Sequence, residues 1–294
     1  MSRATLTGFI AILLWALLAL FTVGTSPVPP FQLNALTFAI GGAIGVVWLL
    51  RTGGVKRLKG VPLSVYAFGT IGLFGYHALY FSALRLAPAA EASLIAYLWP
   101  LLIVILSGLL PGEKLRLGHI LGAFIGFAGA ALIVGGKAEG LDPAHIPGYL
   151  LALCCAFTWS SYSVISRRLG SFPTETVVVY CIATALLSVP AHLALEETLW
   201  PNSLVGWLCI LGLGAGPVGL AFYTWDHGVK KGDIQLLGVA SYAAPLLSTL
   251  VLVIAGFAAP TWTLALAASL ITAGAALAAR TSLKRASKAA KFLL

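Results

Sequence analysis

The sequence predicts an all-α integral membrane protein with ten transmembrane helices, arranged as two inverted five-helix repeats. First, 60% of the 294 residues are hydrophobic and only 9% are charged, more apolar surface than a soluble chain can bury. Second, the apolar residues form runs of about 20, the length a helix needs to cross roughly 30 Å of hydrocarbon. Third, Lys and Arg concentrate in alternate loops, as they do in multi-pass membrane proteins.

Ten apolar runs are expected to form the spans. They cover residues 4–23, 31–50, 61–84, 89–110, 117–135, 147–166, 174–195, 202–225, 234–256 and 261–279. The breaks between them carry turn residues, as in TSPVPP (25–30) and LPGEKLR (110–116). The length of the runs and their lack of alternation exclude a β-barrel. The first run lacks a convincing cleavage site, so we expect a helix there and no cleaved signal peptide.

The cations decide the predicted topology. If the two termini and alternate loops share one side, that side holds sixteen of the 18 Lys and Arg, and only Arg85 and Lys137 lie opposite. This bias predicts ten spans in a cell (inner) membrane with both termini in the cytoplasm. The same bias accounts for the net charge of +9, so a nucleic-acid partner is not needed to explain it. The basic tail, 280–294, fits the same topology, although such a tail can also bind lipid.

An internal repeat appears at an offset of 145 residues, where each of the first five runs falls on a later run. Tyr97 then matches Tyr242, Pro100–Leu102 matches Pro245–Leu247, and an identical AGAAL follows in both fifth spans. A unit with an odd number of spans enters the membrane from opposite sides in its two copies, which is typical of alternating-access transporters. We expect residues 1–140 to form the first repeat, and 141–294 the second with its basic tail.

The third span carries the first candidate binding residues. Tyr76, His77 and Tyr80 share one helix face, one turn beyond Gly69 and Gly72, which permit close helix approach. An ionisable group inside the membrane is costly, and this favours a substrate-binding role for His77. The alternative is a packed histidine hydrogen-bonded to a neighbouring tyrosine.

The fourth span adds Tyr97 and Trp99, which lie beside Pro100 at mid-depth. Proline removes one backbone donor and tends to kink a helix, so a free carbonyl can face a cavity.

The ninth span repeats this pattern, with Ser241 and Tyr242 as candidate pocket residues before Pro245. Pro245 is expected to free the carbonyl of Ser241. Ser248 and Thr249 continue the same polar stripe, and helix–helix hydrogen bonding is the alternative role for all four.

Trp15 and Trp159 lie in the middle of the first and sixth spans, away from the interfacial belt where Trp usually collects. Indole rings with hydroxyls nearby, such as Ser160, suit an aromatic zwitterion. Core packing is the rival interpretation.

Charged residues near span ends have simpler explanations. Arg85 and Glu91 flank Pro88, where they are expected to snorkel, pair with each other or gate the path. Asp226 and Lys230 are expected to be solvated after the eighth span.

No cofactor, metal site or enzyme activity is expected. The five histidines are scattered, the four cysteines all fall inside spans, and no phosphate-binding loop of the G-x-x-x-x-G-K-[ST] type is present. A transporter with these features is driven by a gradient. A membrane enzyme or a channel remains a remote alternative.

The segment ALRLAPAAEASLIAYLWPLLIVILSGLLPGEKL (83–115) resembles the third-to-fourth-span region of the drug/metabolite transporter superfamily, EamA-type branch. The second copy departs from the pattern, since Phe257–Ala258 replaces Gly112–Glu113. The aromatic candidates look most like those of YddG-type exporters of aromatic amino acids.

The resemblance implies export of aromatic and other neutral amino acids by alternating access. Another metabolite, drug or lipid-linked substrate on the same fold is the alternative. The expected partners are a small-molecule substrate and membrane lipid, with no nucleic acid, in a monomer or homodimer.

Overall fold

The computed structural model describes residues 1–135, 142–256 and 259–292, and its regular elements are all helical there. The first half contains α1 (Arg3–Trp15), α2 (Leu18–Gly24), α3 (Pro30–Thr52), η1 (Gly54–Leu58), α4 (Leu63–Thr70), η2 (Ile71–Gly75), α5 (Tyr76–Leu86), α6 (Ala89–Ala96), α7 (Trp99–Ser107) and α8 (Leu117–Val134). The second half contains η4 (Pro143–His145), α9 (Ile146–Arg168), α10 (Thr176–Leu195), α11 (Leu204–Ala215), η5 (Gly216–Leu220), α12 (Ala221–Lys231), α13 (Ile234–Ala240), α14 (Ala243–Ile254) and α15 (Trp262–Phe292). Lys137, Phe257, Ala258 and the expected boundary at 140/141 lie outside the described residues.

The helices confirm the predicted membrane-spanning fold. Within the described ranges, nine helical stretches are long and apolar enough to cross a bilayer. A tenth stretch runs without interruption from Leu63 to Leu86 through α4, η2 and α5. Tyr76, His77 and Tyr80 lie in this stretch and lower its hydropathy. Three of the candidate site residues therefore lie in a span that is less apolar than the nine others.

The backbone itself repeats at an offset of 145 residues. The π-helical turn η2 corresponds residue for residue to the π-helical turn η5, and α5 corresponds to α12 in the same way. The break between α6 and α7 recurs between α13 and α14. Among the described residues each half holds five spans, so the second half crosses the membrane in the opposite sense to the first.

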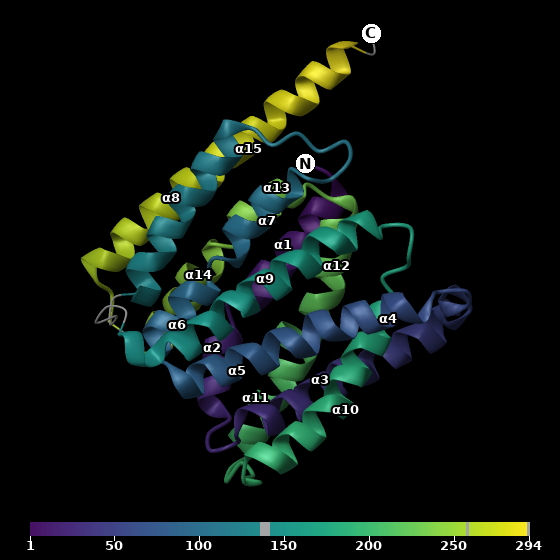
Figure 1. The fold of residues 1–294 in the computed structure, drawn as a ribbon, viewed down its shortest axis with the longest axis vertical. Coiled ribbons are helices and arrows are strands. Elements are labelled where there is room, and N and C mark those ends of the chain that lie inside the picture. The colour runs from purple at the N-terminus through teal and green to yellow at the C-terminus, as the bar shows by residue number, and fades with distance from the viewer. Residues whose placement is uncertain (136–141, 257–258, 293–294) are drawn as a thin grey trace.

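Helix pairing follows this inverted symmetry (Figure 1). The second and seventh spans (α3 and α10) pack together, as do the fifth and tenth (α8 and α15). Two further pairs pack closely, α1 with α12 and α5 with α9. The offset of 145 residues maps one of these pairs onto the other. Gly8 and Gly228 bring α1 and α12 together, since a Cβ on Gly228 would lie only 2.5 Å from the Gly8 Cα.

Gly69 and Gly72 of the third span have the expected role. A side chain at Gly69 would collide with the ring of Tyr180, and one at Gly72 with the ring of Tyr162. Both rings belong to the second half of the chain, so these glycines seat one half against the other.

The eighth span is longer than expected, and two charged residues are buried as a result. α12 continues to Lys231, whereas the apolar run ends at residue 225. Asp226 and Lys230 form an ion pair at 2.9 Å, with side chains only 1% and 3% exposed. The expectation that they are solvated is wrong. α12 continues past the apolar run, and both side chains are covered by neighbouring parts of the chain.

Arg85 pairs with Glu196 at 3.0 Å, not with Glu91 as the local spacing suggested. The Glu196 carboxylate also accepts from the backbone N–H of Phe31 at 3.0 Å and from that of Gln32 at 3.1 Å. It therefore joins α10 to the start of α3 as well as to α5. The turn around Pro88 is present as predicted, but Arg85 pairs with a residue of the second half of the chain.

Candidate substrate cavity between the two halves

A cavity of about 340 Å³ lies at the centre of the bundle, within the 300–1,000 Å³ typical of small-ligand sites. We call the face where α1 begins and α3, α9 and α12 end the N-terminal face. The cavity extends from mid-depth towards the opposite face, where it reaches Val134 of α8 and Leu252 of α14. Within the described residues, no Asp, Glu, Lys or Arg lines it. The site therefore suits a ligand with a large apolar part and no net charge.

The third span supplies one polar wall. The His77 Nδ1 lies 2.8 Å from the carbonyl oxygen of Leu73 and donates to it, since a carbonyl only accepts. In the neutral ring Nε2 is then an acceptor, and no described residue bonds to it. Tyr76 and Tyr80 stack with their rings 6.3 Å apart, and the Tyr80 hydroxyl bonds to that of Ser93 at 2.9 Å.

Tryptophans from both halves form the apolar wall. Trp15, Trp99 and Trp159 all line the cavity, with ring centroids 6.0–6.3 Å apart and edges turned to faces. The Trp15 Nε1 donates to the carbonyl of Pro217 at 3.1 Å, and this bond holds the indole across the interface between the halves.

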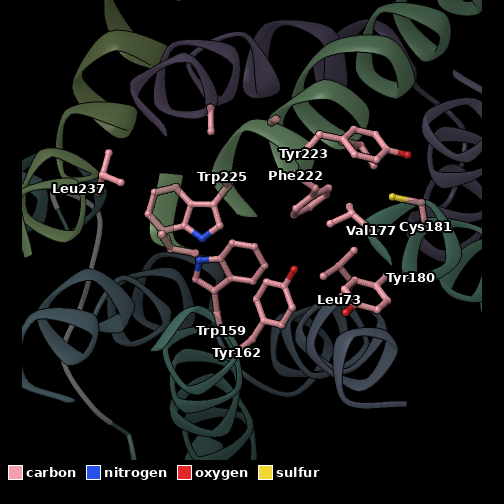
Figure 2. Packing of buried hydrophobic residues seen from close by; sticks show 14 of the residues in the cluster. Leu73, Trp159, Tyr162, Val177, Tyr180, Cys181, Phe222, Tyr223, Trp225 and Leu237 are labelled. Atoms are coloured by element: carbon pink, nitrogen blue, oxygen red, sulfur yellow. The ribbon is translucent and has the colours of Figure 1, made fainter. Parts of the chain in front are cut away.

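Trp225 packs against the tryptophan wall on the side of the N-terminal face. Its ring lies 5.1 Å from that of Trp15 and 6.3 Å from that of Trp159. Figure 2 shows the Trp159 and Trp225 indoles side by side with Phe222 nearby. Trp225 is fully buried and donates to the Ser163 hydroxyl at 3.0 Å. Trp225 does not line the cavity itself, so it supports the tryptophan wall from behind.

Two predicted residues do not reach the cavity. Ser241 and Tyr242 are fully buried one to two turns closer to the N-terminal face. The Tyr242 hydroxyl accepts from the Leu101 N–H at 3.0 Å, while the Ser241 hydroxyl donates to the Leu237 carbonyl at 2.8 Å.

The Ser241 carbonyl is not free either, because it accepts from the Ala244 N–H at 3.0 Å. Pro245 lies in the first turn of α14, where a missing donor leaves little unpaired. Ser248 and Thr249, two turns further along the same stripe, line the cavity instead.

Tyr97 lines the cavity, so seven of the nine predicted residues meet there. Sequence reasoning missed Phe222 and the Pro217–Val218 pair of η5. Phe222 lies 145 residues after His77, so the repeat contained the signal. The Phe222 and His77 rings lie 6.2 Å apart, and Phe38 packs against both.

Residues 2–135 and 146–280 each match the EamA-like transporter family. The chain belongs to this family. Its membership confirms the resemblance drawn from the sequence and places the chain among multi-pass membrane transporters rather than enzymes.

This EamA-family chain is similar to proteins named aromatic amino acid exporter YddG. The Ancylobacter novellus protein of that name is 56% identical over 281 residues, covering 94% of this chain and 97% of its own. The Salmonella typhimurium protein is 27% identical, covering 84% and 86%. A solved crystal structure with 55% identity superposes with a TM-score of 0.92, covering 97% of this chain and 99% of the other.

Ion pairs link the two halves at the N-terminal face of this EamA-family protein. Arg57 contacts Glu175 at 2.7 Å, and Arg167 pairs with Glu113. Arg167 also donates to the carbonyl of Gly232 at 2.7 Å. These contacts join the two halves at the face away from the cavity.

Proposed function

We propose that this protein exports aromatic and other neutral amino acids across the inner membrane by alternating access, with the N-terminal face in the cytoplasm. The observation that carries the proposal is the uncharged cavity walled by Trp15, Trp99 and Trp159. The name of the 56% identical relative, aromatic amino acid exporter, supports the same substrate class.

The geometry suggests how a zwitterion is held. The side chain of an aromatic amino acid packs among the indoles, where edge-to-face contacts favour an aromatic partner. The Tyr76 and Tyr97 hydroxyls and the Nε2 of His77 bond to its carboxylate and ammonium groups. One chain supplies the whole cavity, so we propose that a monomer is sufficient for transport.

The inverted repeat supports alternating access between units 1–140 and 141–294. Under the offset of 145, the cavity residues Tyr80 and Thr249 correspond to Trp225 and Val104, and both counterparts are fully buried on the closed side. Exchanging the conformations of the two halves would close the present cavity and open one at the N-terminal face. The present structure then represents the outward-facing state, and Tyr242 is a pocket residue of the other.

A transport assay in liposomes tests the proposed substrate class. Purified protein reconstituted in vesicles should move labelled Phe, Trp and Thr faster than empty vesicles, and His77→Ala should reduce that flux. Trp200→Ala is the matched control, because Trp200 is half exposed and stacks on Trp207 away from the cavity. If no amino acid moves above the background of empty vesicles, the substrate assignment is wrong.

Cysteine labelling tests the exchange of conformations independently of substrate identity. In a variant with the four native cysteines replaced by alanine, Val104→Cys should react with an impermeant maleimide from the cytoplasmic side, and Thr249→Cys from the other side. Ala123→Cys is the control, since Ala123 is also fully buried but its counterpart does not line the cavity. A Val104→Cys protein that transports yet never reacts from the cytoplasmic side contradicts alternating access by this symmetry.

A further inference from the structure

A second cavity of about 710 Å³ opens at the N-terminal face. It shares no lining residue with the central cavity and lies between α1, α3 and α12 under the α9–α10 connection. We call it the basic groove, and six of its lining residues carry the inference that follows. They are Ile44, Trp48, Arg57, Leu220, His227 and Lys231.

One wall of the basic groove is apolar and exposed. Ile44, Trp48 and Leu220 are 40%, 36% and 45% exposed, and in a membrane-spanning chain such surfaces contact hydrocarbon. Trp48 lies one turn before α3 ends at Thr52, and its ring packs 5.9 Å from that of Tyr223. Trp at this position is typical of the headgroup level of a bilayer. The groove therefore extends from the headgroups into the acyl region.

The other wall is cationic. Arg57 and Lys231 carry its charge and His227 lies among them, while Glu175 is the acidic residue that lines the groove within the described part of the chain. Arg57 already neutralises Glu175 through its 2.7 Å contact. Lys231 is exposed and forms no ion pair with any residue that the structure describes. The rim therefore has an uncompensated positive charge, and the hydroxyl of Ser171 also lines the groove.

We propose that the basic groove binds one anionic phospholipid of the leaflet at the N-terminal face. Its phosphate lies against Lys231 and His227, and an acyl chain runs along Ile44, Trp48 and Leu220. A soluble anion would satisfy the cations but leave the apolar wall uncovered, whereas an uncharged lipid would leave Lys231 without a partner. An anionic lipid matches both walls.

Native mass spectrometry of the full-length protein tests the proposal without any transport step. The probes are phosphatidylglycerol and phosphatidylcholine with identical acyl chains. The wild type should retain phosphatidylglycerol preferentially, and Lys231→Gln should weaken that binding about fivefold while leaving phosphatidylcholine unchanged. Lys59→Gln is the charge-matched control, because Lys59 is exposed on the same face but does not line the groove.

Three results would overturn the lipid site. The two lipids could bind equally, or Lys59→Gln could weaken phosphatidylglycerol as much as Lys231→Gln does, which would reduce the effect to general surface charge. Glycerol phosphate could also displace the lipid at equal concentration, which would identify a site for soluble anions. None of these results depends on the exported substrate, so they leave the proposed transport function untouched.

Discussion

Replacing Lys230 by methionine should destabilise the protein more than any change to a surface cation. Lys230 and Asp226 lie one turn apart on α12, and their charged groups meet at 2.9 Å. The Lys230 Nζ also donates to the carbonyl of Phe172 at 3.3 Å, which ties α12 to the α9–α10 connection. Lys230→Met fills a similar volume but leaves the Asp226 carboxylate buried without its cation.

The magnitude follows from the burial of the pair. Its side chains are 3% and 1% exposed, so water cannot replace the lost partner. Breaking such a pair by removing one member costs about 3–5 kcal/mol, whereas replacing both members by apolar residues is often neutral or stabilising. Lys230→Met should therefore lose about 3–5 kcal/mol of unfolding free energy, and the double variant Asp226→Leu/Lys230→Met should recover most of it.

Equilibrium unfolding in mixed detergent micelles, followed by tryptophan fluorescence, measures both variants against the wild type. Lys59→Met removes a cation from an exposed position on the same face and should change stability by less than about 0.5 kcal/mol. If Lys230→Met is as stable as Lys59→Met, or if the double variant is no more stable than the single one, the pair is not a buried, desolvated ion pair.

Three further variants separate packing from binding. Tyr242→Phe should cost about 1–3 kcal/mol in the same unfolding measurement, because the buried Leu101 N–H loses its acceptor, but substrate affinity in the present state should not change. Trp159→Ala should raise the KM for labelled Trp at least about tenfold in liposomes, with a smaller effect on Thr, since only the aromatic substrate loses ring contacts. An equal effect on both substrates would argue against a role in recognising the ring. Gly72→Ala should lose about 1–3 kcal/mol through collision with the Tyr162 ring, and an unchanged unfolding curve would show that the halves adjust freely there.

Helical periodicity identified helix faces that turn towards the cavity but not the depth of every residue on them. The polar stripe of the ninth span was assigned to the site through Ser241 and Tyr242, while the cavity is lined by Ser248 and Thr249 of that stripe. Residues seven positions apart share a face, so spacing cannot distinguish a residue in the closed half of the bundle from one in the open half. That distinction depends on which end of the interface is packed shut.

Contacts between residues far apart in the sequence could not be predicted, for a related reason. Local spacing offered Glu91 as one possible partner of Arg85, but Arg85 pairs with Glu196, 111 positions away at the end of α10 in the other half. Phe222 could have been found by applying the 145-residue repeat to His77. Only packing shows that both of these residues line the cavity, whereas Tyr80 lines it and its counterpart Trp225 is buried away from it.

The membrane-spanning fold, the number of spans and their inverted repeat were determined by the sequence alone. These properties rest on the length of apolar runs and the distribution of loop charges, which are local and additive along the chain. The tertiary structure decided which aromatic residues meet, which ion pair is buried and which face is closed. Two halves of similar sequence can pack with either end of their interface tight, and their unequal contacts, such as Arg167 with Glu113 on one face only, place the cavity on one side of the membrane centre.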